Sequence, residues 1–304
     1  MSESVGIDTK SQWESAVEHE RRRLIGVAFR MLGTLADAED AVQEAYVRWF
    51  RLDEPARAQV RSIAAWLTTA TTRICLDLLS SARYRHEDYV GPWLPEPIPD
   101  GAALSTNTDP GERVAFSETL SVAMLRVMEH MTPPERVAFV LHDVFGHSFS
   151  EIGEIMQRSP GAVRELASSG RRRLRAERRS EVDQRAHAQV VQAFLEACDD
   201  GDVVRLTSLL DPSVVLTSDG GGFARAARNP IYSADKVARF VLGVRQRRPD
   251  VWLRTGQATD ESVILLVERS GVSGVLSLRV AGGSVVEVWI QWNPHKLTQW
   301  GAIA

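Results

Sequence analysis

The side chains best suited to binding a ligand gather in one stretch of arginines. Eight arginines and only two glutamates lie between Arg158 and Arg179, whereas the whole 304-residue chain has a formal charge of −4. Guanidinium groups bind phosphate oxygens and guanine edges, so this stretch could bind nucleic acid through a local basic patch. A run of this kind is also typical of a solvated helix end. Its interpretation therefore depends on the elements that position it.

Helix-start signals surround these arginines in the segment 132–174. Thr132 and Glu135 have the spacing of a capping box, in which each side chain bonds the other residue's backbone amide, and Ser148 and Glu151 repeat it. Ser159 precedes a proline and opens a third helix. Two short helices followed by one that ends in arginines predict a helix-turn-helix whose last helix reads DNA.

The composition is that of an ordinary globular protein, with 44% hydrophobic and 25% charged residues. A length of 304 residues suggests two or three domains. Because the sequence shows neither a signal peptide nor an apolar run long enough to span a membrane, we expect a cytoplasmic protein with no membrane partner. Cys75 and Cys198 lie in apolar helical patterns without zinc spacing, so we expect buried thiols, no metal and no cofactor.

The first 90 residues are predicted to form three helices, at 12–32, 37–52 and 61–81. Gly33 ends the first helix, and Asp37 is expected to cap the second. One polar face of the second helix carries Asp37, Asp40, Gln43, Glu44 and Arg48. These acids either complement the helix dipole and solvate the helix, or form a docking face for a basic partner helix.

The third helix combines an apolar stripe with a polar face that continues into basic and aromatic residues. The polar residues are Thr69, Thr72, Arg73, Asp77, Ser80 and Ser81, followed by Arg83, Tyr84 and Arg85. Interleaved basic and aromatic side chains bind phosphates and stack on unpaired bases. The cluster alone is a weak indication of nucleic-acid binding.

The segment 91–112 holds five prolines and is predicted to be a semi-rigid linker that is neither helical nor a central strand. Trp93 and Leu94 are its only large apolar pair. Either Trp93 packs on whichever domain is nearest, or the pair docks on the C-terminal domain or in a channel of a partner protein.

From about residue 184 the pattern becomes mixed. We expect helices at 186–198 and up to 210, a strand at 214–217, a helix at 233–246 capped by Ser233, and strands at 252–257, 263–268, 274–280 and 285–291, with a turn at Gly282-Gly283. Helices followed by a strand meander predict an α+β cone.

Several long motifs, in order, resemble one family. RMLGTLADAEDAVQEAYVRW, WLTTATTRICLD and TPPERVAFVLHDVFGHSFSEI resemble regions 2 and 4 of extracytoplasmic-function (ECF) sigma factors of bacterial RNA polymerase. YVGPWLPEP resembles the inter-region motif of the subgroup with a SnoaL-like C-terminal extension, and FLEACDDGDVVRLTSLLDPSVVLTSDGGG resembles that extension. The tail Asn293-Pro294-His295-Lys296-Leu297 resembles a motif of the same subgroup. The implied fold is multidomain, with two all-α helical domains followed by an α+β SnoaL-like cone. The implied segments are region 2 at 1–90, the linker at 91–112, region 4 at 113–180 and the cone at 184–304.

The resemblance implies roles for matching positions. The helix that docks on the coiled coil of the polymerase largest subunit would use Asp37, Asp40, Gln43, Glu44 and Arg48. Opening and reading the minus-ten element would use Arg73, Asp77, Ser80, Ser81, Arg83 and Arg85. Reading the minus-thirty-five element would use Arg158, Ser159, Arg164, Glu165, Ser168, Arg171 and Arg172. Where related sequences often have arginine and alanine, this chain has Ser169 and Gly170, so we expect one phosphate contact fewer, a more flexible helix and weak binding to duplex alone.

The cone-shaped fold raises the question of catalysis. Acid-base candidates are Asp211, Asp219, Asp260, His187 and His295, and none is paired with a second motif. A ligand-sensing pocket and a protein-facing regulatory role are the other interpretations, and the regulatory role is preferred. The residues expected to make interdomain regulatory contacts are Trp93, Leu94, Pro95, Asp219, Gly220, Gly221, Gly222, Asn293 and Pro294.

The sequence therefore predicts an alternative sigma factor that is not an enzyme. Its partners would be the RNA polymerase core and promoter DNA, with a small-molecule ligand of the C-terminal domain as an additional possibility. The alternatives are a stand-alone helix-turn-helix regulator with a ligand-sensing SnoaL-like domain, and a SnoaL-type enzyme tethered to DNA.

Overall fold

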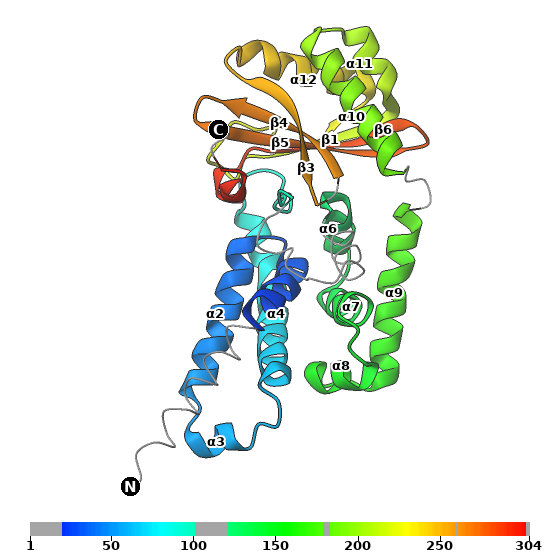
Figure 1. Cartoon of the computed structure of the whole chain (residues 1–304). Helices are drawn as coiled ribbons and strands as arrows, with labels where there is room; N and C mark the ends of the chain where they lie inside the picture. The colour runs from blue at the N-terminus through cyan, green and yellow to red at the C-terminus, as the bar shows by residue number, and fades with distance from the viewer. Residues whose placement is uncertain (1–19, 101–120, 179–182, 260, 302–304) are drawn as a thin grey trace. The chain divides into compact units, whose positions relative to one another are not determined.

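The computed structural model describes residues 20–100, 121–178, 183–259 and 261–301, with residues 82–88 and 177–178 described by their backbone alone. The chain divides into two compact units (Figure 1). The first comprises 1–83, 103–113 and 128–172, and the second comprises 84–102, 114–127 and 173–304. The first is helical and the second is mainly an α+β domain, as predicted. The four segment boundaries predicted from the sequence stay predictions.

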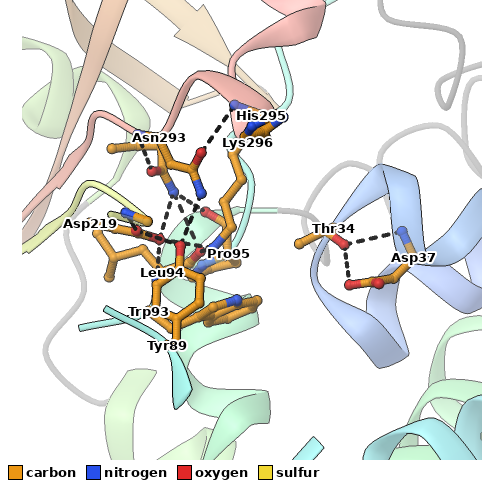
Figure 2. Close-up of polar contacts among 12 residues, drawn as sticks. Thr34, Asp37, Tyr89, Trp93, Leu94, Pro95, Asp219, Asn293, His295 and Lys296 are labelled. Carbon is orange, nitrogen blue, oxygen red and sulfur yellow. Dashed lines mark hydrogen bonds and ion pairs between the residues drawn. The ribbon is translucent and has the colours of Figure 1, made fainter. Parts of the chain in front are cut away.

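The N-terminal helices of the first unit are residues 20–32, α2 (Leu35–Arg51), α3 (Glu54–Ala58) and α4 (Ile63–Asp88). Gly33 has a φ of 82° and ends the first of them, as predicted. The predicted cap of α2 was wrong. Thr34 is the N-cap, and its hydroxyl accepts a hydrogen bond from the amide of Asp37. Asp37 lies one turn further on, where its carboxylate accepts from the Thr34 hydroxyl at 2.6 Å (Figure 2).

Two buried arginines support the first unit. Arg30 is 1% exposed and donates to the carbonyl of Gly26, and burial lowers its pKa to about 9. Arg136 is 8% exposed and donates to the carbonyls of Met31 at 2.6 Å and Met128 at 2.8 Å. A guanidinium group has five N–H donors, so it can satisfy several backbone carbonyls in a protein interior. Arg136 therefore links the carbonyls of Met31 and Met128 to α7, whereas the Gly26 bond of Arg30 stays within its own helix.

The helix-turn-helix consists of α7 (Pro133–Phe139), α8 (Phe149–Met156) and α9 (Pro160–Arg178), preceded by α6 (Val122–Glu129). Both predicted capping boxes are confirmed, at Thr132 with Glu135 and at Ser148 with Glu151. A five-residue π-helix, Val140–Val144, follows α7 and was not predicted.

The C-terminal domain has three helices and a six-stranded sheet. The helices are α10 (Gln184–Asp199), α11 (Val203–Leu209) and α12 (Ala234–Arg247). The strands are β1 (Leu210–Asp219), β2 (Ile231–Tyr232), β3 (Trp252–Ala258), β4 (Glu261–Glu268), β5 (Gly271–Ala281) and β6 (Ser284–Gln291). Their order in the sheet is β2-β1-β6-β5-β4-β3. All three helices lie on one face of the sheet (Figure 1). The order of the helices and strands along the chain is as predicted, apart from the additional β2.

Three details differ from the sequence prediction. β1 is longer than expected, because its parallel pairing with β6 extends from Leu210 to Asp219. β2 was not predicted, and its two residues pair with β1. Ser233 precedes α12, but its side chain makes no capping hydrogen bond and its φ is 83°. The predicted turn at Gly282 and Gly283 is confirmed, with φ of 58° and 84°.

Candidate polymerase, DNA and linker-binding sites

The acidic face of α2 contains both paired and unpaired side chains. Glu44 and Arg48 form an ion pair at 2.8 Å one turn apart, and Asp37 is held by Thr34. Asp40 and Gln43 are exposed and make no hydrogen bond or ion pair within the described part of the chain. The two free side chains at the centre of this face are therefore available to a partner. The opposite face buries Ala38, Ala41, Val42, Ala45 and Trp49.

The polar face of α4 is partly engaged within the first unit. The Arg73 guanidinium donates to the carbonyl of Ile155 at 3.0 Å and makes a weaker contact with Glu154 at 3.4 Å. Ser80 and Ser81 are exposed, but their hydroxyls bond carbonyls of their own helix. Asp77 is exposed. Arg73 is itself exposed, so the rest of its guanidinium remains accessible beside these two contacts.

Two predictions for α4 have other outcomes. Thr72 was expected on the polar face, but it is fully buried. The side chains of Arg83 and Arg85 lie outside the described residues, so their roles stay predictions. The two serines could still contact DNA, because hydroxyl bonds to a helix carbonyl are easily exchanged for other partners.

The recognition helix α9 presents charge on one side and packs on the other. Val163 and Ala167 are fully buried and lie on the packing side of the helix. Exposed residues on or before the helix are Arg158, Ser159, Arg164, Glu165 and Arg172, whereas Ser168 and Arg171 are half-buried. Arg171 is paired with Asp143 of the π-helix at 3.2 Å, and Arg164 lies 5.3 Å from the Phe149 ring centre. The ion pair orients Arg171 along the helix-turn-helix rather than outward.

Close packing around position 170 explains why a glycine is found there. A Cβ atom at this position would lie 3.2 Å from Cβ of Phe139 and 3.4 Å from the sulfur of Met131. The glycine therefore lets α9 approach α7 closely. The flexibility predicted for this position has no support in the packing, since Gly170 is buried inside the helix.

The most completely partnered charge in the chain's second unit is the carboxylate of Asp219, at the end of β1. It is fully buried and accepts hydrogen bonds from the Tyr89 hydroxyl at 2.7 Å, the Leu94 amide at 2.9 Å and the Gly221 amide at 2.9 Å (Figure 2). The Lys296 ammonium lies 2.8 Å from the same carboxylate. Buried carboxylates are stable only when paired and hydrogen-bonded, and this one meets both conditions.

Lys296 connects the linker to the turn after β6. Its side chain is 6% exposed, and its ammonium donates to the Leu94 carbonyl at 2.6 Å as well as to Asp219. The ammonium also lies 4.0 Å from the ring centre of Trp93 and 5.1 Å from that of Tyr89. Aromatic faces attract a desolvated cation. Burial and the hydrogen bond to Asp219 raise the pKa of Tyr89 above its ordinary value, so Tyr89 remains a proton donor.

The glycines after Asp219 are required by close contacts. A Cβ atom at Gly221 would lie 2.2 Å from the Asn293 amide nitrogen, and one at Gly220 would lie 2.3 Å from the Ala224 carbonyl. Gly221 also has a φ of 58°. Asn293 uses this space to donate to the Tyr89 hydroxyl at 3.0 Å. The DGGG run is thus a backbone that fits against the turn after β6.

The rest of the linker follows the sheet edge. The Pro97 carbonyl accepts a hydrogen bond from the Trp300 indole at 2.8 Å, and Pro99 forms an antiparallel bridge with Ala258 of β3. Leu94 is buried with Val122 and Trp289. Within the second unit, the linker therefore contacts the C-terminal domain, as one of the two alternatives expected. Its described residues, 91–100, form no central strand.

The structure brings together most of the residues predicted to make interdomain contacts. Those in mutual contact are Trp93, Leu94, Pro95, Asp219, Gly220, Gly221 and Asn293 with the adjoining Pro294 and Gly222. We call Tyr89, Trp93, Leu94, Asp219, Gln291, Asn293 and Lys296 the linker site. Sequence reasoning missed Tyr89, Gln291 and Lys296. Tyr89 opens the quoted linker motif and Lys296 lies in the tail, so both carried a signal; Gln291 carried none.

The acid-base candidates do not share a pocket. His187 contacts the Leu278 carbonyl, Asp211 accepts from Ser213, and the hydrogen bonds from Ser213 lower the pKa of Asp211. Asp260 lies outside the described residues. Between the helices and the sheet is a cavity of about 30 Å³, room for a water or two. Its lining is apolar apart from Arg245 and Arg248 and contains none of the candidates.

Within the described ranges, no group of three histidine, cysteine, aspartate or glutamate side chains could hold a metal ion. Cys75 and Cys198 are free and buried, as predicted. Burial raises the pKa of the Cys198 thiol to about 12. No helix in the described part of the chain is long and apolar enough to cross a membrane.

Comparisons with known proteins cover almost the whole chain. Residues 16–85 match the Sigma-70 region 2 family, and residues 121–174 match the Sigma-70, region 4 family. The chain is 38% identical over 296 residues to the ECF RNA polymerase sigma factor SigJ of Mycobacterium tuberculosis, covering 93% of each protein. It is 31% identical over 282 residues to the probable ECF RNA polymerase sigma factor SigI of the same species, covering 91% of this chain and 92% of SigI. The crystal structure of SigJ matches with a TM-score of 0.70 at 35% identity, covering 95% of this chain and 98% of that one.

Proposed function

The chain belongs to the ECF RNA polymerase sigma factors, and from that premise we propose which of its surfaces perform each step of promoter recognition. Membership confirms the predicted role as an alternative sigma factor, which binds the polymerase core and promoter DNA. The cytoplasm, where core polymerase meets the chromosome, is its proposed place of action. The roles of individual residues and of the C-terminal domain are the proposal.

Core polymerase docks on the exposed face of α2. The support for this role is that Asp40 and Gln43 are exposed and unpaired, whereas Glu44 and Arg48 neutralise each other at 2.8 Å. An exposed carboxylate without an internal partner, as at Asp40, attracts a basic helix and adds specificity to docking. The expected acceptor is the coiled coil of the largest polymerase subunit.

The minus-ten element is opened and read along α4, and the minus-thirty-five element is read by α9. Arg73, Asp77, Ser80 and Ser81 lie on the polar side of α4, where an extruded base would need phosphate anchors. On α9, Arg164 and Arg172 are exposed and can reach phosphates or base edges. The ion pair of Arg171 with Asp143 makes Arg171 a weaker candidate for direct readout than the other two.

The C-terminal domain regulates the other two parts by holding the linker between them. The observation that carries this proposal is the buried Asp219 carboxylate, which binds the linker through the Leu94 amide and the Tyr89 hydroxyl. A fused domain acts at high effective concentration, so it needs no free partner to hold the linker. Any change in the binding of the linker to Asp219 would alter how regions 2 and 4 reach the two promoter elements.

Deletion of the C-terminal domain tests the regulatory role. A chain that stops after Arg179 loses Asp219 and Lys296 and so cannot hold the linker. We expect run-off transcription with purified core polymerase to change, in rate or in promoter affinity, relative to the full chain. Unchanged transcription and unchanged promoter affinity would contradict a regulatory role.

Catalysis by the C-terminal domain is not part of the proposed function. The cavity of about 30 Å³ has no carboxylate or imidazole in its lining, and acid-base chemistry needs such a group within hydrogen-bond reach of the substrate. Turnover of a conjugated ketone by the purified chain would revive the enzyme alternative. Duplex binding without core polymerase would favour the stand-alone regulator.

A further inference from the structure

The loop between β1 and β2, residues 220–230, exposes an aromatic ring and two arginines. Phe223 is 68% exposed, so most of its ring is accessible to a ligand. Arg225 and Arg228 are also exposed, and neither makes a hydrogen bond or ion pair with any described residue. The loop therefore leaves both arginines without a partner among the described residues and most of the Phe223 ring in contact with solvent.

Two neighbouring segments extend the exposed surface. A Cβ atom at Gly222 would lie 3.3 Å from Val90, which is 53% exposed, and one at Gly91 would lie 3.9 Å from Cα of Arg228. The Phe223 ring packs edge-on against His295 with 4.4 Å between centres. Val90, Phe223, Arg225, Arg228 and His295 thus belong to one continuous surface, which we call the loop patch.

The loop between β1 and β2 carries positive charge through its two arginines. The sequence contains no acidic residue between Asp219 and Asp235. Asp219 itself is fully buried and paired with Lys296, so it does not neutralise the two arginines at the surface. Exposed rings between unpaired arginines are the combination with which proteins bind single-stranded nucleic acid, because bases stack on the ring while the arginines contact phosphates.

We propose that the loop patch binds unpaired promoter DNA. The choice of strand state follows from Phe223, since the bases of a duplex are stacked on each other and offer no face to a protein ring. Duplex DNA would use the arginines alone. Surfaces that bind proteins commonly have a polar rim of mixed charge. This loop instead carries two arginines and no acidic residue.

The position of the patch in the chain indicates which unpaired DNA it binds. Val90 is the second residue after α4 ends at Asp88, and α4 is the helix to which the proposed function assigns the minus-ten element. Because so few residues separate Val90 from α4 along the chain, we assign the unpaired DNA of the minus-ten region to the loop patch. This step rests on the proposed function of α4, and the test below separates the two.

The test uses holoenzyme, formed from core polymerase and the full chain, and a fluorescent promoter fork with an unpaired non-template strand through and beyond the minus-ten element. Phe223→Ala should weaken fork binding about tenfold, as expected for the loss of one stacked base. Phe223→Trp should restore it, because the ring is retained. Arg225→Ala with Arg228→Ala should reduce the slope of log affinity against log salt by about 1.4, as expected for two phosphate contacts on a single strand.

Matched controls lie on the opposite edge strand of the same sheet. Trp252 is 48% exposed and Arg254 is exposed, and both are on β3, whereas the loop patch adjoins β1 and β2. Trp252→Ala and Arg254→Ala should leave fork binding unchanged. Binding to a fully duplex promoter fragment should differ little between the wild-type chain and Phe223→Ala, because a duplex offers no base face to the ring.

Three results would overturn the inference. In the first, the patch variants have the same fork affinity and the same salt slope as the wild-type and control chains. A second is loss of affinity for core polymerase with an unchanged salt slope, which would make the patch a protein contact. The third is equal losses in the patch and control variants. If wild-type holoenzyme itself fails to bind the fork, the role assigned to α4 fails as well, and that result is distinct from the first three.

Discussion

The linker site and the recognition helix α9 use charge in opposite ways. In the linker site, Asp219 and Lys296 are buried, and their charges are bound by each other and by hydrogen bonds from the linker. On α9, Arg164 and Arg172 remain at the surface. A buried pair has one acceptable geometry, whereas an exposed arginine keeps its hydration and can move to meet a phosphate.

This difference indicates that the linker site fixes the geometry of the linker, whereas the exposed face of α9 contacts DNA. Removing one member of a buried pair leaves the other charge desolvated and unpaired, so the site tolerates little change. Exposed ion pairs such as Glu44 with Arg48 contribute little to stability and are easily exchanged for contacts with a partner. We therefore expect stability to depend on the linker site, and promoter affinity to depend on the exposed faces.

The largest effect is expected for Asp219→Ala, which would leave Lys296 buried without its carboxylate. We expect a loss of about 3–5 kcal/mol of unfolding free energy for the C-terminal domain, measured by denaturant titration. Asp211→Ala is the control on the same strand, because Asp211 only accepts hydrogen bonds from nearby Ser213. Equal losses for the two variants would show that the buried pair has no special role.

Gly221→Ala should have the next largest effect. Its φ of 58° is unfavourable for alanine, and the new Cβ would lie 2.2 Å from the Asn293 amide nitrogen. We expect about 1–3 kcal/mol of destabilisation, from backbone strain plus displacement of Asn293. Gly282→Ala is a close control, because Gly282 has the same φ of 58° but has no atom within 4 Å of its Cβ position. A cost no greater than that of Gly282→Ala would contradict the proposed tight contact.

The smallest effect is expected in the helix-turn-helix, at the capping box of α8. The hydrogen bonds from Ser148 lower the pKa of Glu151 below its ordinary value of about 4.3. A lowered carboxylate pKa stabilises the folded state above the ordinary pKa, and this stabilisation is lost as the pH falls through the lowered value. Protection of the Ser148 amide from hydrogen exchange should therefore weaken on acidification below about pH 4.

Glu151→Gln is the control for this titration. The amide can still accept from the Ser148 backbone, but it does not titrate, so amide protection should no longer vary with pH over this range. The same acid dependence in the variant would assign the effect to another group, such as His147 at 4.0 Å from Glu151.

Local signals in the sequence predicted local structure. The capping boxes at Thr132 and Ser148, the helix end at Gly33 and the turn at Gly282 each depend on residues within one turn of each other, and all four are confirmed. The cap of α2 failed because Thr34 and Asp37 both fit a cap position and only the geometry of the chain chooses between them.

Long-range contacts could not be read from the sequence. The partners of Asp219 lie 125 residues earlier at Leu94 and 77 residues later at Lys296, and no local periodicity indicates that they meet. The motifs containing Trp93, Asp219 and Asn293 were identified as regulatory candidates, but the charge pair at their centre was not. Likewise, the contact of Arg73 with the end of α8 depends on the packing of segments 81 and 82 residues apart.

The central claim is that the C-terminal domain acts on transcription by holding the linker at Asp219. The most direct measurement compares Asp219→Asn with Asp211→Asn in two assays on the full chain, which are hydrogen exchange at the Leu94 amide and run-off transcription with core polymerase. We predict that Asp219→Asn alone loses Leu94 protection and alone changes transcription. Loss of Leu94 protection with unchanged transcription would contradict the claim.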